Sequence, residues 1–136
     1  MAGLGATLRI LVIDDSRDFQ LLIKTYLNGS GWSCLSAADA LQATGIAVRE
    51  KPHLILLDIG LPGGDGLLLL DRLRANAHTR TIPIVVATGQ TTAGLEAKAR
   101  TKGAAAFLHK PIEKAILLET LEQVLREFTC ATTKPS

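Results

Sequence analysis

Five short apolar runs alternate along the chain with longer segments of helical periodicity. The runs cover residues 8–13, 32–37, 54–57, 83–87 and 105–108, and the second of them predicts a weaker strand than the others. Short apolar runs closed by turn residues are typical of strands buried on both faces, and regular alternation with helices is typical of a parallel sheet. The pattern therefore predicts an α/β fold, a doubly wound five-stranded parallel sheet with helices on both faces.

Five helices are predicted between and after the runs. They cover about 16–27, 39–50, 67–75, 95–102 and 112–128. Helical spacing places Leu41 on the apolar face of the second helix and Leu67, Leu70 and Leu73 on that of the third. Residues 129–136 are expected to form a disordered tail, so that one domain covers residues 1–128.

Composition and charge exclude several classes of protein. A chain of 136 residues can bury the core of one domain, and its 15 basic and 13 acidic residues are interspersed. The sequence has no basic patch of the kind that would indicate nucleic-acid binding. No apolar segment could span a membrane, and the first eight residues do not form a signal peptide. Cys34 and Cys130 lack the spacing of a metal site, which favours reduced structural thiols and a cytoplasmic location.

Polar side chains stand at the carboxyl ends of four of the five predicted strands. Asp14 and Asp15 follow the first run, Asp58 the third and Thr88 the fourth, and Lys110 follows the fifth. In a parallel sheet these ends lie along one edge, where open α/β sheets bind ligands. Three neighbouring carboxylates repel one another, so such a site is poised to bind a divalent cation or to hold a proton. Ligands that are oxygen atoms only favour Mg2+ over zinc.

In their order along the chain, these residues resemble the receiver domains of two-component response regulators, over about residues 8–128. The matching residues are Asp14-Asp15, the loop Asp58-x-x-x-Pro62-x-x-Asp65-Gly66, Thr88, and Gly103-Ala104-x-x-Phe107-Leu108-x-Lys110-Pro111. The resemblance implies the flavodoxin-like strand order 2-1-3-4-5, in which the first and third strands are neighbours. Asp15 and Asp58 can then meet.

The resemblance also implies a magnesium site. Asp15 and Asp58 would bind Mg2+ directly, Asp14 would act largely through water, and the backbone carbonyl of Gly60 would complete the protein ligands. Gly60 and Gln90 hold the two variable positions that, in this family, influence how long a bound phosphoryl group survives.

The same resemblance implies a phosphorylation switch. Asp58 would take a phosphoryl group from a histidine kinase or a histidine phosphotransfer protein, and Thr88 and Lys110 would contact the transferred group. Its charge would then bias two arrangements of the surface made by the fourth helix, fifth strand and fifth helix. Phe107 holds the family's aromatic switch position, although core packing would explain an aromatic residue there equally well.

A receiver of this kind acts through partners. The implied partners are a downstream output domain or protein, and a second copy of the chain bound through the same surface. A module of this kind catalyses its own phosphorylation and hydrolysis and turns over no external metabolite, so we do not expect an enzyme.

Other functions share parts of the pattern. A Mg2+-dependent aspartate-nucleophile phosphohydrolase places its nucleophile after the first strand in an Asp-x-Asp pattern, whereas Asp14 and Asp15 are adjacent. A flavin or nucleotide binder of the same fold would meet repulsion from the acidic turn that begins at Asp14. A receiver that signals by binding alone stays open, although the intact set of acids, threonine and lysine argues against it.

Overall fold

The computed structural model describes residues 8–60 and 66–133 and contains one five-stranded sheet. Its strands are β1 (Leu8–Ile13), β2 (Trp32–Ala37), β3 (Leu54–Leu57), β4 (Ile84–Thr88) and β5 (Ala106–His109). They lie in the order β2-β1-β3-β4-β5, and every neighbouring pair is parallel. The predicted fold class and strand order are therefore confirmed.

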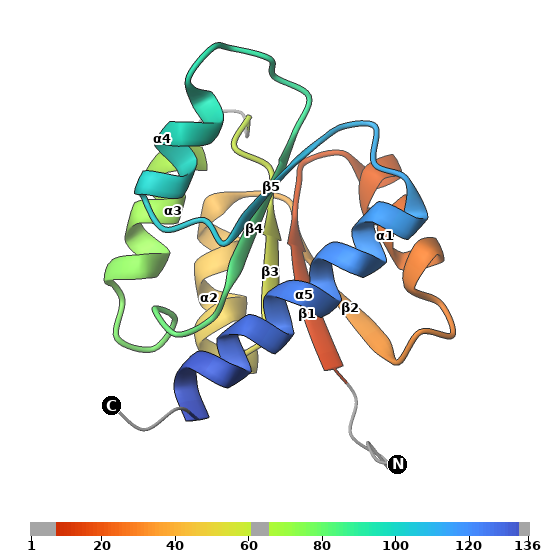
Figure 1. Cartoon of the computed structure of the whole chain (residues 1–136), viewed down its shortest axis with the longest axis horizontal. Helices are drawn as coiled ribbons and strands as arrows, with labels where there is room; N and C mark the ends of the chain where they lie inside the picture. Colours follow the sequence, from red (N-terminus) through yellow and green to blue (C-terminus); the bar gives the residue numbers. More distant parts are fainter. Residues whose placement is uncertain (1–7, 61–65, 134–136) are drawn as a thin grey trace.

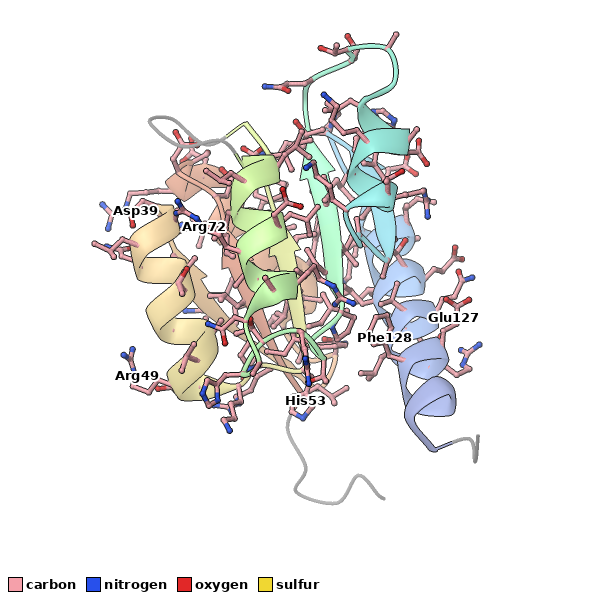
Figure 2. All side chains as sticks on the ribbon, turned by 90° about the vertical axis from the view of Figure 1, so that its left-hand side faces the viewer. Asp39, Arg49, His53, Arg72, Glu127 and Phe128 are labelled. Atoms are coloured by element: carbon pink, nitrogen blue, oxygen red, sulfur yellow. The ribbon has the colours of Figure 1, made fainter. Side chains whose placement is uncertain are left out.

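Helices cover both faces of the sheet. They are α1 (Arg17–Leu27), α2 (Ala40–Glu50), α3 (Gly66–Ala75), α4 (Leu95–Thr101) and α5 (Lys114–Thr133). α1 and α5 pack on one face, and α2, α3 and α4 pack on the other (Figure 1). Figure 2 looks onto the second face, where these three helices stand side by side.

The last helix runs further than its sequence pattern predicted. α5 ends at Thr133 rather than at Phe128, so residues 129–133, which were expected in the tail, are helical. Only 134–136 of the expected tail lie outside the described residues.

The sheet separates two apolar clusters. Leu11 and Ile13 of β1 point into the cluster beneath α2, α3 and α4, and Ile10 and Val12 point into the cluster beneath α1 and α5. Successive side chains of a strand alternate between its faces, so a strand buried on both faces must be apolar at every position. All four residues are at most 1% exposed, which explains why this part of β1 is a continuous apolar run.

Two helix faces differ from those predicted. Leu41 is 88% exposed because α2 buries Ala43 and Ala47 instead. At 100° per residue, Leu41 lies on the opposite side of the helix from Ala43. In α3, Leu69 is buried while Leu67 only packs against the edge of the core, and the other two leucines of the predicted stripe are buried as expected.

Polar caps fix where the first two helices begin. The Ser16 hydroxyl accepts a hydrogen bond from the Phe19 amide at 3.1 Å, and the Asp39 carboxylate accepts one from the Gln42 amide at 2.8 Å. Figure 2 shows Asp39 at one end of α2 and Arg49 near the other. An acid at the start of α2 and a base near its end suit the dipole of this helix.

A glycine allows α3 to start close to the end of β3. A Cβ atom on Gly66 would lie 2.2 Å from the Cα of Ile59, so no other residue fits there without a shift of the backbone. Pro62 and Asp65, which belong to the predicted loop motif, lie outside the described residues. The contact between Gly66 and Ile59 holds the chain just beyond Asp58 against the body of the domain.

The structure bears on two predictions, the state of the cysteine thiols and the lack of a membrane-spanning segment. Cys34 is a free, partly buried thiol, whereas the side chain of Cys130 is outside the described part. Among the helices of residues 8–60 and 66–133, none combines the length and the apolar character that crossing a membrane requires.

Candidate functional site

Three carboxylates gather where β1 and β3 end. The Asp58 amide donates to the Ile13 carbonyl and the Asp14 amide donates to the Ala37 carbonyl, each at 3.0 Å, so the parallel ladders continue just past the strands. One carboxylate oxygen from each of Asp14, Asp15 and Asp58 lies within 4.8 Å of the others. The acids that were expected to share this edge therefore form one cluster.

The three acids differ in their access to solvent. The side chain of Asp14 is 1% exposed and that of Asp58 is 11% exposed, whereas Asp15 is classed as exposed. Among residues 8–60 and 66–133, the cluster is thus closed on the side of Asp14 and open on the side of Asp15, so Asp58 is accessible from the rim.

Lys110 follows β5, at one edge of the sheet, and its side chain reaches this cluster. Its amide donates to the Thr88 carbonyl at 2.9 Å, which continues the pairing of β4 with β5. Its Nζ donates to Asp14 Oδ2 at 2.6 Å and lies 3.4 Å from Asp58 Oδ2. One ammonium group therefore contacts both acids, and it offsets part of their mutual repulsion.

Asp14 is held by both of its carboxylate oxygens. Oδ1 accepts a hydrogen bond from the Ser16 amide at 2.9 Å, and Oδ2 accepts the bond from Lys110. Burial raises the pKa of Asp14 above its usual range, although the hydrogen bond from Lys110 acts in the opposite direction. The ionised form of Asp14 therefore depends on positive charge close by.

Thr88 ends β4 beside the strand that carries Asp58. Leu57 of β3 pairs with Val86 of β4, so Thr88 lies at the same rim as the acids. The Thr88 side chain is buried, and its hydroxyl accepts a hydrogen bond from the Gln90 amide at 3.1 Å. A hydroxyl that accepts in this way still carries its own hydrogen as a donor.

Gly60 and Gln90 lie next to each other over Asp58. The Gly60 amide donates to Asp58 Oδ1 at 2.8 Å. A Cβ atom on Gly60 would lie 3.1 Å from the side-chain nitrogen of Gln90. The two predicted variable positions thus face each other across the entrance to the site, and the role of the Gly60 carbonyl as a ligand stays a prediction.

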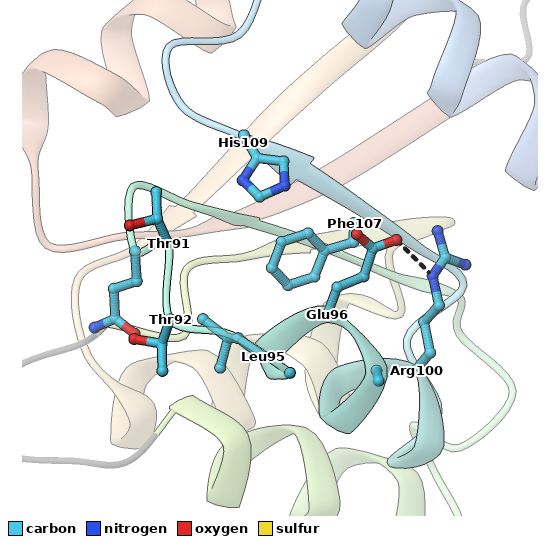
Figure 3. A pocket seen from close by; sticks show the side chains of 10 residues that line it. Thr91, Thr92, Leu95, Glu96, Arg100, Phe107 and His109 are labelled. Carbon is cyan, nitrogen blue, oxygen red and sulfur yellow. Dashed lines mark hydrogen bonds and ion pairs between the residues drawn. The ribbon is translucent and has the colours of Figure 1, made fainter.

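Phe107 lies beside a cavity between α4, β5 and the loop after β4 (Figure 3). The cavity has a volume of about 540 Å³, and the Glu96–Arg100 ion pair, at 3.0 Å, lies on its α4 side. Phe107 is 8% exposed and belongs to the cluster beneath α2, α3 and α4, and its ring centroid is 5.1 Å from that of His109. Phe107 is therefore a core residue in this conformation, and its role as a switch stays a prediction.

Two residues of α1 contribute to the site without having been predicted there. The Gln20 side-chain amide donates to the Asp14 carbonyl at 2.6 Å, and the Phe19 ring centroid lies 4.1 Å from Lys110 Nζ. Phe19 is partly buried and packs against the cluster beneath α1 and α5. Nothing in the local sequence pairs it with a lysine from the other end of the chain.

The donor set suits a hard divalent cation. The cluster offers carboxylate oxygens from Asp14, Asp15 and Asp58, and two of these acids face the open side. Mg2+ prefers oxygen ligands and keeps several waters, so an open, acidic rim fits it. These residues therefore fit the predicted metal.

The fold and the cluster together define a receiver domain. Residues 10–122 match the family model described as the response regulator receiver domain. The chain belongs to this family, which provides signalling modules of two-component systems. This membership favours signalling over the phosphohydrolase alternative.

Curated relatives are about one third identical to the chain over the aligned residues. The phosphate regulon transcriptional regulatory protein PhoB of Pseudomonas aeruginosa is 35% identical over 117 residues, which are 86% of this chain and 51% of PhoB. Protein PilH of the same organism is 31% identical over 86% of this chain and 97% of PilH. Response regulator PleD of Caulobacter vibrioides is 33% identical, and the match covers 26% of its length. The chain thus spans about half of PhoB, a quarter of PleD and nearly all of PilH.

Solved structures agree with this assignment. The signal receiver domain of a putative LuxO repressor protein from Vibrio parahaemolyticus superposes with a TM-score of 0.86 at 26% identity, over 96% of this chain and 98% of that one. The chemotaxis response regulator CheY4 of Vibrio cholerae superposes with a TM-score of 0.80 at 25% identity, over 87% of this chain and 98% of that one.

Proposed function

We propose that this chain is a phospho-accepting receiver and that Asp58 is its phosphorylation site. The observation that carries the proposal is the placement of the Lys110 ammonium between Asp14 and Asp58, 2.6 Å and 3.4 Å from their oxygens, at the open rim of the sheet. A nucleophile that accepts a phosphoryl group needs positive charge beside the oxygens that carry the developing negative charge. Lys110 occupies that place.

The donor is a phosphohistidine of a histidine kinase or of a histidine phosphotransfer protein. A carboxylate oxygen of Asp58 attacks the phosphorus, and the bond between phosphorus and the imidazole nitrogen breaks. That nitrogen leaves with the electron pair, and the product is an aspartyl phosphate. The Gly60 amide and the Lys110 ammonium each hold one Asp58 oxygen, so the carboxylate is oriented before the reaction.

Asp14, Asp15, Asp58 and the Gly60 carbonyl are the groups that would hold Mg2+. When bound, the ion would neutralise negative charge on the oxygens of the transferring group. Lys110 would turn from Asp58 towards a phosphoryl oxygen while it keeps its short contact with Asp14.

Thr88 links the phosphoryl group to the output surface. Its hydroxyl would donate to the added group, and the Gln90 amide, which bonds to the same hydroxyl, would follow. That movement reaches the cavity beside Phe107, which is formed by α4, β5 and the loop between β4 and α4. The surface of α4, β5 and α5 would then meet an output domain or protein, or a second copy of the chain.

The relatives support this arrangement of partners. PhoB is a transcriptional regulatory protein, and nearly half of its length lies beyond the match, which fits a receiver joined to an output domain. PilH is matched over nearly its whole length, which fits a receiver that acts on a separate protein. In either case the histidine donor and the receiver would meet in the cytoplasm.

Phosphorylation can be tested with a small donor. The protein is incubated with Mg2+ and an acyl phosphate or phosphoramidate, and intact mass is expected to show one base-labile phosphoryl adduct. Asp58→Asn should abolish the adduct because the amide is not a nucleophile. Asp71→Asn is the matched control, since Asp71 is an exposed acid of α3 paired with Lys102.

Two results would contradict the proposal. One is an adduct that persists in Asp58→Asn, which would place the reactive group elsewhere. The other is the absence of an adduct with every donor in the presence of Mg2+. The second result would favour a receiver that signals by binding alone.

A further inference from the structure

The ammonium of Lys110 has an aromatic neighbour as well as two acidic ones. The centroid of the Phe19 ring lies 4.1 Å from Nζ, on the same ammonium group that contacts Asp14 and Asp58. A cation at this distance from a ring face is attracted by the quadrupole of the ring. The position of the ammonium is therefore defined by two carboxylates and one ring.

The contacts among Asp14, Ser16, Phe19 and Lys110 link each of these residues to the next and the last to the first. Asp14 Oδ1 accepts a hydrogen bond from the Ser16 amide, and the Ser16 hydroxyl accepts one from the Phe19 amide. The Phe19 ring contacts Lys110, whose Nζ donates to the other oxygen of Asp14. The first turn of α1 thereby holds the ring in register with both the acid and the lysine.

A second contact fixes α1 against the segment that carries Lys110. The Tyr26 hydroxyl donates to the Ile112 carbonyl at 2.9 Å. Tyr26 lies two turns after Phe19, so both side chains project from the same side of the helix. α1 therefore touches the chain after β5 at two points, at the lysine ammonium and at the backbone just beyond it.

We propose that Phe19 is a positioning residue that aims Lys110 at the phosphoryl group. The inference rests on the proposed phosphorylation of Asp58. Lysine has a flexible four-carbon stem and a strongly hydrated head, and the Lys110 side chain is 22% exposed. The ring covers one side of the ammonium and attracts it, so the lysine is held at the rim when Asp58 changes from a carboxylate to an aspartyl phosphate.

The effect of removing the ring follows from the strength of such contacts. A cation–π contact at a partly exposed site changes an equilibrium or a rate by about 3- to 10-fold. Phe19→Leu retains an apolar side chain but lacks the ring face. We expect this variant to form the Asp58 adduct about 3- to 10-fold more slowly than the wild type, and Phe19→Tyr to restore the rate.

A spectroscopic measurement separates this role from general packing. In the unmodified protein the ring current of Phe19 should shift the Lys110 ε-methylene resonances, which can be assigned by their loss in Lys110→Arg. The shift should disappear in Phe19→Leu and persist in Phe19→Tyr. Leu21→Ala is the control, because it also shortens an apolar side chain of α1 but on the exposed side of the helix, so the shift should persist in it.

The outcomes are distinct. The inference is overturned when the wild type is phosphorylated and Phe19→Leu matches its rate, or when the ε-methylene shift is the same in both proteins. A wild type that takes no phosphoryl group overturns the proposed function, and the NMR shift still decides whether the ring holds the ammonium. Phe19→Met serves as the second variant if Phe19→Leu fails to fold.

Discussion

Asp14 is the most buried acid of the cluster, and its burial opposes its charge. Desolvation raises the pKa of this carboxyl group more than the bonds from Lys110 and the Ser16 amide lower it. A carboxyl group whose pKa is higher in the folded state than in the unfolded state binds its proton more tightly when folded. The ionised Asp14 therefore lowers the stability of the fold at neutral pH. Protonated Asp14 contributes stability below its ordinary pKa of 3.8, and this contribution is lost as the pH rises through the raised pKa of the folded state.

Asp14→Asn is expected to stabilise the protein in EDTA. The amide has no charge to desolvate, and its oxygen can still accept the bond from Ser16. Because Lys110 keeps Asp58 as an ionic partner at 3.4 Å, we expect a gain of about 1 kcal/mol in the free energy of unfolding, or roughly 3–5 °C in Tm. Thermal unfolding by circular dichroism at neutral pH measures this gain, which should shrink as the pH is lowered.

The wild type and Asp14→Asn should also differ in how much Mg2+ raises their Tm. A ligand that binds only the folded state raises Tm, so the wild type should gain stability with Mg2+ and Asp14→Asn should gain less. Asp15→Asn is the control, since Asp15 is exposed and its loss should affect only the response to Mg2+. A lower Tm of Asp14→Asn in EDTA would show that the bond to Lys110 outweighs the cost of burial.

At the scale of the elements, the junction between β3 and α3 tolerates little change. A Cβ atom on Gly66 would meet the Cα of Ile59 at 2.2 Å and its carbonyl oxygen at 2.6 Å. These are backbone atoms, which cannot rotate away as a side chain can. Any larger residue at this position must push α3 or the chain after Asp58 out of place.

Two glycine-to-alanine variants should therefore change stability in opposite directions. Gly66→Ala should destabilise the fold by about 1–3 kcal/mol through overpacking, and it should slow phosphorylation because Ile59 follows Asp58. Gly45→Ala should stabilise it by about 0.5–1 kcal/mol, since Gly45 lies inside α2 and a Cβ there would have nothing within 4 Å. Urea denaturation of both variants measures the difference. Equal effects would refute the steric argument.

The same elements show what sequence can and cannot predict. The buried strands were predictable because they are short apolar runs closed by a turn or a polar residue, as in Leu54–Leu57 before Asp58, whereas the edge strand β2 contains two serines and gave a weaker pattern. The buried side of α2 was not, because an alanine-rich helix has no distinct apolar stripe, and Leu41 proved to be exposed. The end of α5 was also missed, since the threonines near Thr133 are weak helix formers.

The candidate site was predictable for a different reason. Parallel strands bring their carboxyl ends to one edge whatever their exact bounds, so Asp14, Asp58 and Lys110 could be placed together without a structure. The contact between Phe19 and Lys110 could not, because it depends on how α1 tilts across the segment after β5. Spacing along one helix contains no information about that angle.

At the scale of the whole molecule, the two apolar clusters share one sheet. Their side chains do not mix, but both are built on the backbone of β1, β3 and β4. Loss of one cluster exposes strands that the other needs. Unfolding should therefore be cooperative across both faces of the sheet.

Trp32 provides a probe of this coupling. It is the only tryptophan, and it packs against the cluster beneath α1 and α5. Leu73→Ala removes a buried side chain of α3 on the opposite face and should cost about 2–5 kcal/mol. Trp32 fluorescence and far-UV circular dichroism should report the same lowered urea midpoint. A fluorescence midpoint that stays at the wild-type value would show that the two faces unfold separately.

The positive charge of Lys110 also determines which charge on a bound ion would make the site neutral. The three ionised acids bring three negative charges and the lysine brings one positive charge, so the site carries a net charge of −2. A divalent cation makes the site neutral, whereas a monovalent ion leaves it negative and a trivalent ion makes it positive. Without the lysine, the same acids would be balanced by a trivalent ion. Lys110, which we propose contacts the phosphoryl group, would thus also select the ion that accompanies it.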